Sequence, residues 1–401
     1  MNSNQPKRIL TIFGTRPEAI KVAPLITALK KDPRFECSVI FTGQHKEMVL
    51  PIMDWFDIKP DHTLSVMEHK QPLARLSGKL LNGLHEIIEE TRPDTVMVQG
   101  DTTSTFMAAL TAYYGYDYYV RNDLHDRRRK IEIAHIEAGL RTYDNYAPFP
   151  EEANRRMVGH LATHHFAPTL TAATALYDEN ITDNVFITGN TVIDALFETV
   201  EMLKTKPLNP LPQLPENARF VLITGHRREN YGDGFDNICK AIKTLAHQHP
   251  ETFFVYPVHL NQHVHNPVME HLDNTPNIIL TDPLDYPNFI ALMQRCHLVL
   301  TDSGGLQEEA PSLGKPVLVM RDVTERPDAV MAGTAKIVGT QTDKIITETN
   351  TLLTNNDAYT KMAEAINPYG DGLATQRILN ILAGQAGADN IFDASVALKA
   401  A

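Results

Sequence analysis

Two adjacent glycines, Gly304 and Gly305, lie in the stretch TDSGGLQEEAPSLGKP at 301–316, directly after an apolar run. The pattern predicts a strand that ends at Asp302, a helix that begins at the glycines, and a stop at Gly314 before Pro316. A helix N-terminus offers unpaired N–H groups and partial positive charge, and glycines let an anion approach the backbone. We therefore predict a phosphate site, with Ser303 as helix N-cap or phosphate contact; the alternative is a turn that binds nothing.

Carboxylates near the ends of predicted strands are candidates for proton transfer. Asp101 lies in QGDTTST, Glu137 in HIEAGLRT and Glu151 in FPEEANRR. Two of them have structural alternatives, since Asp101 can cap a helix and Glu151 can compensate a helix dipole. The three together nevertheless form a set suited to acid/base catalysis. Arg155 lies one turn beyond Glu151, which allows either a salt bridge or an anion contact.

Cationic side chains near strand ends would hold an anionic substrate. Arg16 follows the first predicted strand in GTRPE, Lys21 lies about one turn further along, and His226 follows a later strand in TGHRREN. Ligands of open α/β sheets bind at the carboxyl ends of the strands, so these residues are predicted to line an anion site. Simple exposure to solvent is the alternative.

Motifs for cofactors and metals are missing from the sequence. No GxGxxG follows a predicted strand, which argues against a tightly bound nicotinamide dinucleotide. His-rich segments such as HLNQHVHNP contain neither HExxH nor another recognised ligand spacing, and no GxSxG or P-loop pattern occurs. We therefore expect no cofactor and no metal.

The elements that would position these residues alternate between strand and helix. The predicted strands are Arg8–Gly14, Cys37–Gly43, Thr95–Gly100, Ile131–Glu137, His164–Pro168, Val185–Gly189, Phe220–Gly225, Thr252–Val258, Asn277–Asp282, Leu298–Asp302, Pro316–Met320 and Ala335–Gly339. This rhythm is typical of βαβ units. It predicts an α/β fold with two Rossmann-like, doubly wound parallel-sheet domains that face each other across a cleft, the expected active site.

A proline-rich segment, TKPLNPLPQLPEN at 205–217, interrupts the alternation. We interpret it as a linker between an N-terminal domain at 1–204, which carries the carboxylates, and a C-terminal domain at 218–375. Residues 376–401 are expected to form a C-terminal helix and tail.

Composition limits the class of function. A chain of 401 residues with 43% hydrophobic and 21% charged residues is typical of a soluble globular protein with two domains. The net charge of −12 argues against nucleic-acid binding, and no apolar run is long enough to cross a bilayer. The N-terminus has no signal-peptide pattern, so we expect a cytoplasmic protein. Its three cysteines form no CxxC pair and should be reduced.

Nine motifs together resemble one enzyme family. They are FGTRPEAIKVAPL, TGQHKEM, QGDTTST, HIEAGLRT, PFPEEANRR, ITGNTVIDAL, TGHRREN, YPVHLN and TDSGGLQEEAPSLGKPVLVMRDVTERPDA. Over about residues 7–380 the chain closely resembles the non-hydrolysing UDP-N-acetylglucosamine 2-epimerases of bacteria. The resemblance implies a GT-B-type fold, reversible conversion of UDP-GlcNAc to UDP-ManNAc, and a homodimer.

Position by position, the resemblance also implies roles for site residues. The catalytic carboxylates are Asp101, Glu137 and Glu151, with His226 beside them at the leaving group. Substrate contacts are Arg16, Lys21 and Arg155, and the diphosphate is held by Ser303, Gly304 and Gly305. Glu309 contacts the ribose, Phe289 lies near the uracil, and Arg326 lines the cleft.

Two features depart from the family pattern. Residues 115–130, rich in arginine and aspartate, look like an insertion; a solvated loop is one interpretation, and an oligomer contact or lid is the other. In some members UDP-GlcNAc also activates the enzyme from a neighbouring site. Gln44 and His259 match that site, but Lys70 stands where an arginine is expected, which argues against activation here.

Elimination is the chemistry that fits these residues. The C2 hydrogen of a hexosamine is not next to a carbonyl, so loss of UDP together with the C2 proton, giving 2-acetamidoglucal, is the expected route. The open alternatives are a hydrolysing epimerase, an epimerase of another UDP-2-acetamido sugar, a GT-B glycosyltransferase and a UDP-sugar-binding regulator.

Overall fold

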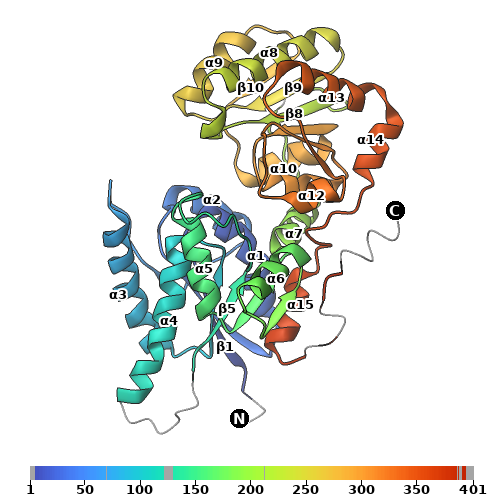
Figure 1. The fold of residues 1–401 in the computed structure, drawn as a ribbon. Coiled ribbons are helices and arrows are strands. Elements are labelled where there is room, and N and C mark those ends of the chain that lie inside the picture. Colours follow the sequence, from blue (N-terminus) through green and yellow to red (C-terminus); the bar gives the residue numbers. More distant parts are fainter. Residues whose placement is uncertain are drawn as a thin grey trace. The chain divides into compact units, whose positions relative to one another are not determined.

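The computed structural model describes residues 5–68, 70–121, 130–211, 213–385, 387 and 391–393, with no side-chain description for 116–121. The chain divides into two compact units, which are coloured along the sequence in Figure 1. Unit 1 contains the described residues up to Ala195 together with Gly370–Asp393, and unit 2 contains Leu196–Tyr369.

Unit 1 is built on a seven-stranded parallel sheet with the order β3-β2-β1-β4-β5-β6-β7. Its strands are β1 Lys7–Phe13, β2 Phe35–Phe41, β3 His62–Thr63, β4 Thr95–Gln99, β5 Glu132–Ile136, β6 His164–Ala167 and β7 Val185–Ile187. The chain order reverses between β1 and β4, and such a switch point places ligand sites at the carboxyl ends of the two central strands.

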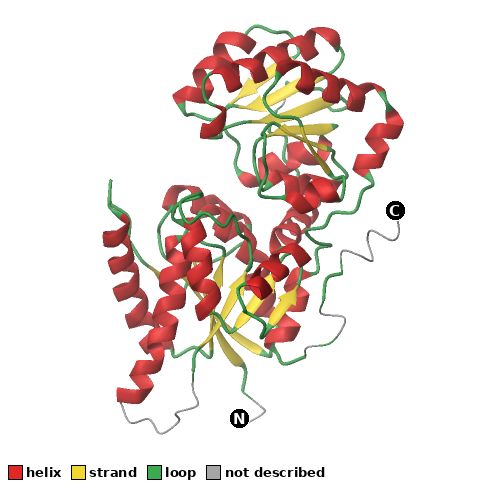
Figure 2. Ribbon diagram, in the orientation of Figure 1, coloured by secondary structure: helices red, strands yellow, loops and turns green. Residues whose placement is uncertain are grey.

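Helices cover both faces of this sheet, as the secondary-structure colouring in Figure 2 shows. They are α1 Arg16–Lys31, α2 Lys46–Trp55, α3 Leu73–Thr91, α4 Thr103–Arg121, α5 Glu151–Leu161, α6 Leu170–Asp178 and α15 Ala374–Leu382, while α7 Thr191–Thr205 begins in unit 1 and ends in unit 2. Successive strand residues point to opposite faces. Leu10 and Ile12 therefore pack with α3 and α4, whereas Ile9 packs with α1 and α15.

Unit 2 repeats the design with a six-stranded parallel sheet in the order β10-β9-β8-β11-β12-β13. Its strands are β8 Phe220–Thr224, β9 Phe253–Pro257, β10 Ile278–Thr281, β11 Leu298–Thr301, β12 Val317–Val319 and β13 Ala335–Ile337. Its helical segments are η1 Arg228–Asn230, α8 Asp233–Gln248, α9 Gln262–Leu272, α10 Tyr286–Arg295, α11 Leu306–Glu309, η2 Ala310–Leu313, α12 Pro327–Met331, α13 Thr342–Thr354 and α14 Asn356–Ala363. Here the order reverses between β8 and β11.

The predicted fold class, two Rossmann-like parallel-sheet domains, is confirmed. Every predicted strand is present, and the short edge strand β3 is one that the sequence did not indicate. The expected domain limits, 1–204 and 218–375 around a linker at 205–217, stay a prediction. The structure itself assigns the last described helix, α15, to unit 1.

The predicted insertion at 115–130 is described only in part. Helix α4 continues through Arg121, so the first residues of that segment are helical. Residues 122–129 lie outside the described part of the chain, and with them the predicted loop, oligomer contact or lid.

Two negative findings hold for the described residues. None of their helices combines the length and the apolar character needed to cross a membrane. No group of three or more His, Cys, Asp or Glu side chains within the same residues is arranged to hold a metal ion.

Candidate active site

The turn after β1 is tied to the turn after β4 by one buried carboxylate. Glu18, in the first turn of α1, is 2% exposed. Its Oε2 accepts from the backbone N–H groups of Gly14 at 2.9 Å and Thr15 at 2.6 Å. Its Oε1 accepts from the hydroxyls of Thr102 at 2.6 Å and Thr105 at 2.8 Å. Glu18 therefore fixes the geometry at the switch point of the sheet.

A pocket of about 360 Å³ lies in this region of unit 1. Five of the predicted site residues line it, namely Lys21, Gln44, Asp101, Glu137 and Glu151. The carboxyl ends of β1, β4 and β5 come together here, which explains why residues far apart in the sequence share one pocket.

Glu137 is held in the pocket by a lysine and two amide side chains. Both of its oxygens lie 2.6 Å from Lys21 Nζ. Gln99 Nε2 donates to Oε2, and Asn190 Nδ2 donates to Oε1 at 3.0 Å. The Glu137 side chain is 5% exposed, and its backbone is left-handed, with φ +63°. Lys21, predicted as a substrate contact, thus pairs with a predicted catalytic carboxylate.

Asp101 follows β4 in a more open position, with 24% of its side chain exposed. Burial raises the pKa of its carboxyl, the Arg155 guanidinium opposes that rise, and the negative charge of Glu137 adds to it. Arg155 Nη2 donates to Asp101 Oδ2 at 2.6 Å, and Asn154 donates to the Asp101 backbone oxygen at 2.9 Å. Asp101 does not simply cap α4, since its side chain is paired with α5.

Helix α5 presents two glutamates with different surroundings. Glu151, its first residue, lines the pocket. Glu152 is fully buried and accepts from the backbone N–H groups of Thr142 and Tyr143, each at 3.0 Å. Its Oε2 also lies 3.2 Å from Arg155 Nη1, so the salt bridge foreseen for Arg155 involves Glu152 and Asp101.

Not every predicted residue of unit 1 lines the pocket as Gln44 does. Gln44 accepts from Ser104 Oγ at 2.8 Å. Arg16 and Lys70 are exposed and do not line the pocket. His45, which the sequence did not single out, does line it, and burial lowers the pKa of its ring. Its Nδ1 has no hydrogen-bond partner among the described residues.

The glycine turn of unit 2 differs in detail from its prediction. Gly305 is the N-cap of α11, and the N–H of Ser303 donates to Thr301 Oγ1 at 2.9 Å, so Ser303 is not the cap. The reason is that the turn extends two residues further before helical geometry begins. The predicted stop is confirmed, because Gly314 ends η2 in the left-handed conformation, with φ +65°.

Neither glycine of the turn is required by the backbone. Gly305 has φ −62°, and Gly304 is not in the left-handed region. A Cβ at Gly304 would lie 3.7 Å from Arg227 Nη2, and one at Gly305 would lie 3.8 Å from Glu309 Oε2, both ordinary contact distances. The fold would accept a side chain at either position.

A buried aspartate orders the cationic loop beside this turn. Asp302 is fully buried and accepts from the backbone N–H groups of His226 and Arg227, each at 2.9 Å to Oδ2. The sequence indicated Asp302 only as a strand end. His226 is partly exposed, and its ring stacks on that of His259, with 5.8 Å between centroids. Two predicted residues are thus brought together.

The remaining predicted contacts of unit 2 lie around the same turn or on α10. Arg326 Nε donates to Glu308 Oε1, so this arginine already has a carboxylate partner. Glu309 is nearly buried, and Phe289 lies partly exposed on α10. A charged pair that the sequence did not indicate lies nearby, with Arg321 Nη1 2.8 Å from Glu325 Oε2.

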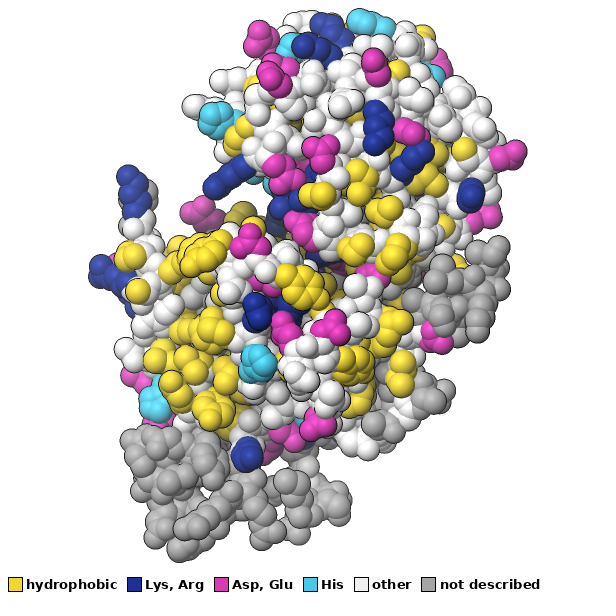
Figure 3. Space-filling model, in the orientation of Figure 1, with side chains coloured by type: hydrophobic (Ala, Val, Ile, Leu, Met, Phe, Trp, Pro, Cys, Tyr) yellow, Lys and Arg dark blue, Asp and Glu magenta, His cyan; other side chains and the backbone are white. Residues whose placement is uncertain are grey.

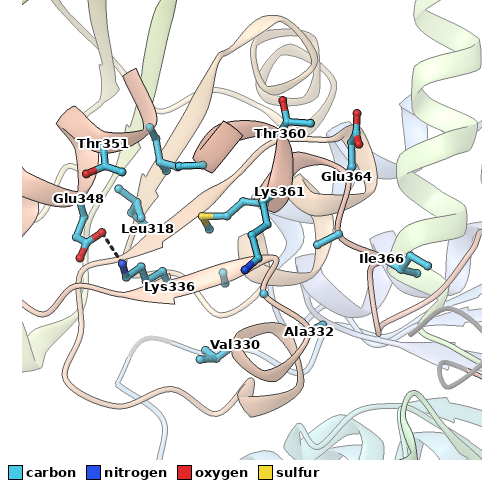
Figure 4. Close-up of a pocket in the computed structure, with 16 residues that line it drawn as sticks. Leu318, Val330, Ala332, Lys336, Glu348, Thr351, Thr360, Lys361, Glu364 and Ile366 are labelled. Carbon is cyan, nitrogen blue, oxygen red and sulfur yellow. Dashed lines mark hydrogen bonds and ion pairs between the residues drawn. The ribbon is translucent and has the colours of Figure 1, made fainter. Parts of the chain in front are cut away.

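A larger pocket of about 780 Å³ occurs in unit 2 (Figure 4). Its lining is mostly aliphatic, and its Lys336 pairs with Glu348 at 2.6 Å. No predicted site residue lines it. Size alone therefore does not identify the chemistry, and the smaller pocket of unit 1 is the candidate active site.

Comparison with known proteins gives the family. A profile of UDP-N-acetylglucosamine 2-epimerase matches residues 27–383. The UDP-N-acetylglucosamine 2-epimerase of Yersinia pestis is 49% identical over 382 residues, covering 94% of this chain and 98% of that protein.

Two solved structures of similar proteins contain ligands. UDP-GlcNAc 2-epimerase from Neisseria meningitidis bound to UDP-GlcNAc has a TM-score of 0.83 at 45% identity, covering 94% of this chain and 99% of that chain. The Methanocaldococcus jannaschii UDP-GlcNAc 2-epimerase in complex with UDP-GlcNAc and UDP has a TM-score of 0.75 at 30% identity, with coverage of 94% and 99%. The chain has a GT-B-type fold of two Rossmann-like domains, and it belongs to the UDP-N-acetylglucosamine 2-epimerase family.

Proposed function

We propose that this protein catalyses the reversible epimerisation of UDP-GlcNAc at C2, giving UDP-ManNAc, without net hydrolysis. Family membership supports the reaction, and the relative with bound UDP-GlcNAc supports the substrate. The single observation that carries the proposal is that Asp101, Glu137 and Glu151 line one pocket together with Lys21.

The proposed reaction is an elimination followed by an addition. A carboxylate removes the C2 proton, the electron pair of the C–H bond forms the C1=C2 double bond, and UDP leaves C1 with the electron pair of the C1–O bond. The product of this step is 2-acetamidoglucal. UDP then returns to C1 while an acid delivers a proton to the opposite face of C2, so atoms and charges balance over the cycle.

Such a cycle needs at least one carboxylate that accepts a proton and one acid that delivers one. The pocket of unit 1 supplies candidates for both. Glu137 is surrounded by nitrogen donors, whereas burial raises the pKa of Asp101, which suits a group that carries a proton during part of the cycle. We assign Glu151 to the same set because it lines the same pocket. Arg155 is proposed to bind substrate while it holds Asp101.

Stabilisation of the departing diphosphate is the second requirement. We assign it to the glycine turn of unit 2, at Ser303, Gly304 and Gly305. The Arg227 guanidinium supports this assignment, because it is a cation that lies 3.7 Å from where a Cβ at Gly304 would be. His226, Arg16 and Lys21 are proposed as further contacts of the leaving group. Glu309 is proposed to contact the ribose and Phe289 the uracil, and Arg326 is proposed to line the substrate site.

We further propose a homodimer that acts in the cytoplasm. Figure 3 shows hydrophobic side chains gathered over a face of unit 1. The exposed large hydrophobic residues of unit 1 include Tyr113 and Tyr114 on α4 and Met157 on α5. A contiguous apolar face of this kind is typical of a subunit contact. Light scattering of the purified protein tests the stoichiometry, and a monomer at all concentrations would contradict it.

The neighbouring activator site is proposed to be weak or missing. Gln44 and His259 are the matching residues, and Lys70 replaces the expected arginine. The rate should therefore depend hyperbolically on UDP-GlcNAc concentration, and a sigmoidal dependence would contradict this proposal.

The decisive experiment is proton NMR of the purified protein with UDP-GlcNAc in D₂O and no added cofactor. We expect UDP-ManNAc that carries deuterium at C2, with little free UDP. Stoichiometric ManNAc and UDP would instead identify a hydrolysing enzyme. An unchanged spectrum would contradict the proposed substrate and lead to other UDP-2-acetamido sugars, then to acceptors for a glycosyltransferase and to binding alone for a regulator.

A further inference from the structure

Two amide side chains that have no assigned role hold Glu137. Gln99, at the end of β4, donates from Nε2 to Glu137 Oε2. Asn190, directly before α7, donates from Nδ2 to Oε1 at 3.0 Å. Both amides are 2% exposed. They come from two separate elements of unit 1, and Lys21 of α1 contacts the same carboxylate.

The orientation of the Asn190 amide is fixed by a separate contact. Its Oδ1 accepts from the backbone N–H of Val192 at 3.1 Å, in the first turn of α7. Because the oxygen is used there, the NH₂ group is the end that faces Glu137. At Asn190 the Glu137 carboxylate therefore meets an N–H donor, which cannot accept a hydrogen bond in return.

The backbone of Glu137 is constrained as well. A left-handed φ at a residue other than glycine costs about 1–2 kcal/mol. The neighbouring residues hold it there, since Ala138 N–H donates to the Phe166 oxygen at 3.1 Å. A Cβ at Gly139 would lie 2.1 Å from the Ala172 oxygen, so the chain packs closely at the next position too. With the backbone fixed, the two amides determine where the carboxylate oxygens point.

We infer that Gln99 and Asn190 are positioning residues that keep Glu137 ionised and fixed in orientation, so that Glu137 is the proton acceptor of the resting site. The inference rests on the proposed epimerisation. A protonated carboxyl would have to place an O–H against an N–H donor, and this disfavours protonation. Gln99 and Asn190 thus act through Glu137, with no contact to substrate required.

Some charged groups around Glu137 favour its ionised form, and others oppose it. Lys21 from α1 favours the ionised form, and Asp101 from the turn after β4 opposes it. Glu151 from α5 lines the same pocket and is a further negative charge. His135 on β5 stays neutral, because burial lowers its pKa to about 3. The two amides are therefore the neutral groups that shift the balance towards the carboxylate.

The test is the pH dependence of kcat/KM for Gln99→Met and Asn190→Leu. Each change removes a donor to an ionised acceptor, so the acid limb should move to higher pH by about one to two units. Activity at low pH should fall about tenfold to a hundredfold and return as the pH rises above the new limb. An equal loss at every pH, or an unmoved limb, would overturn the inference.

A control distinguishes positioning from general stability. Asn277 in unit 2 is another buried amide, which donates to the backbone oxygens of Ala246, His249 and Thr252 at 2.8–3.1 Å. Asn277→Leu should lower the unfolding temperature while the acid limb of kcat/KM stays in place. If this variant shifts the limb as far as the Gln99 and Asn190 variants do, the inference is wrong.

A second measurement does not depend on turnover. Carboxyl ¹³C NMR of the unliganded protein, labelled in glutamate, reports the titration of Glu137, with Glu137→Gln identifying its resonance. The resonance should titrate at higher pH in Gln99→Met and Asn190→Leu than in the unmodified protein. If the resonance shifts as expected but UDP-GlcNAc gains no deuterium at C2, the proposed function is refuted and the positioning of Glu137 stands. If the titration is unchanged, the positioning of Glu137 is refuted.

Discussion

Arg155 donates from Nη2 to Asp101 Oδ2 at 2.6 Å, joining helix α5 to the turn after β4. The same guanidinium lies 3.2 Å from the fully buried Glu152, so it is held from two sides. A residue predicted to bind substrate therefore also controls the charge of a predicted catalytic carboxylate. This relationship gives the first prediction.

Arg155→Met should move the Asp101-dependent limb of the kcat/KM profile to higher pH by about one unit. Burial already raises the pKa of Asp101, and Arg155 is the group that opposes the rise most strongly. Its removal lets that pKa rise further. Initial rates from pH 5 to pH 10 measure the shift.

The matched control for this change is Arg156→Met on the same helix. Arg156 is more exposed and pairs with Glu179 at 3.3 Å, away from Asp101. Its replacement should leave the profile in place. Equal profiles for the two variants would contradict a specific effect of Arg155.

Glu18→Ala should lower the free energy of unfolding by about 2–4 kcal/mol, since several buried donors lose their acceptor. The two backbone N–H groups at Gly14 and Thr15 have no substitute acceptor in a side chain of that size. Turnover should fall as well, because Thr102 follows Asp101 directly and is anchored by Glu18. Urea denaturation and kcat measure the two effects.

Glu18→Gln should restore most of that stability. Its amide oxygen can accept from the backbone, and its NH₂ can donate to the hydroxyls of Thr102 and Thr105. A glutamine variant as unstable as the alanine variant would show that the charge, and not the hydrogen bonding, matters at this position. Glu36→Gln on the exposed face of β2 is the control that should change neither quantity.

Gly304→Ala combined with Gly305→Ala should weaken UDP binding at least tenfold without unfolding the protein. The added Cβ atoms meet only ordinary contacts, and Gly305 already has a helical φ. Stability should be unchanged or rise by about 1 kcal/mol, as expected when a glycine at a compatible position is replaced. Calorimetric titration with UDP measures the loss of affinity, and denaturation measures whether stability is kept.

Gly314→Ala is the opposite case and serves as the control. Gly314 has φ +65°, where an alanine costs about 1–2 kcal/mol. This variant should be less stable and still bind UDP. Unaltered UDP affinity in the Gly304/Gly305 variant would remove the phosphate role from the turn.

Much of the fold and part of the candidate site were predictable from the sequence. Glycines and polar residues at the ends of the apolar runs indicate where the loops lie. Parallel strands place all their carboxyl ends at the same edge of the sheet. This accounts for the pocket that Asp101 and Glu137, at marked strand ends, share with Glu151, while the catalytic role of the three carboxylates stays a prediction. The stop at Gly314 followed from turn chemistry alone.

The residues that the sequence missed share a physical reason. Gln99 and Asn190 lie inside the motifs QGDTTST and ITGNTVIDAL, but as neutral amides they carry no catalytic signal, because their importance depends on which carboxylate they face in three dimensions. His45 carried no spacing signal, and Asp302 was visible only as a strand end because its partners, His226 and Arg227, come from a distant loop. The N-cap of α11 is Gly305 because of the length of the preceding turn, and the capping preferences of single residues do not specify that length.

Asp194 provides a pH prediction outside the site. It lies in the first turn of α7, and its Oδ1 accepts from the Thr375 N–H of α15 at 2.7 Å. Its Oδ2 is buried with no hydrogen-bond partner among the residues that the structure describes. Burial raises the pKa of this carboxyl to about 6 in the folded protein. In the unfolded chain an aspartate titrates near its ordinary value of about 3.9.

A pKa that is higher in the folded state means that the folded protein binds the proton more tightly. The contribution of Asp194 to stability is therefore fully present below about pH 4 and is lost as the pH rises through about 6, a change on the order of 3 kcal/mol. Asp194→Asn keeps an oxygen for Thr375 and cannot ionise, so its advantage over the unmodified protein should grow between pH 4 and pH 7. Guanidinium denaturation of both proteins across that range measures the difference. A difference that is constant with pH would mean that Asp194 is ionised in the folded protein throughout the range.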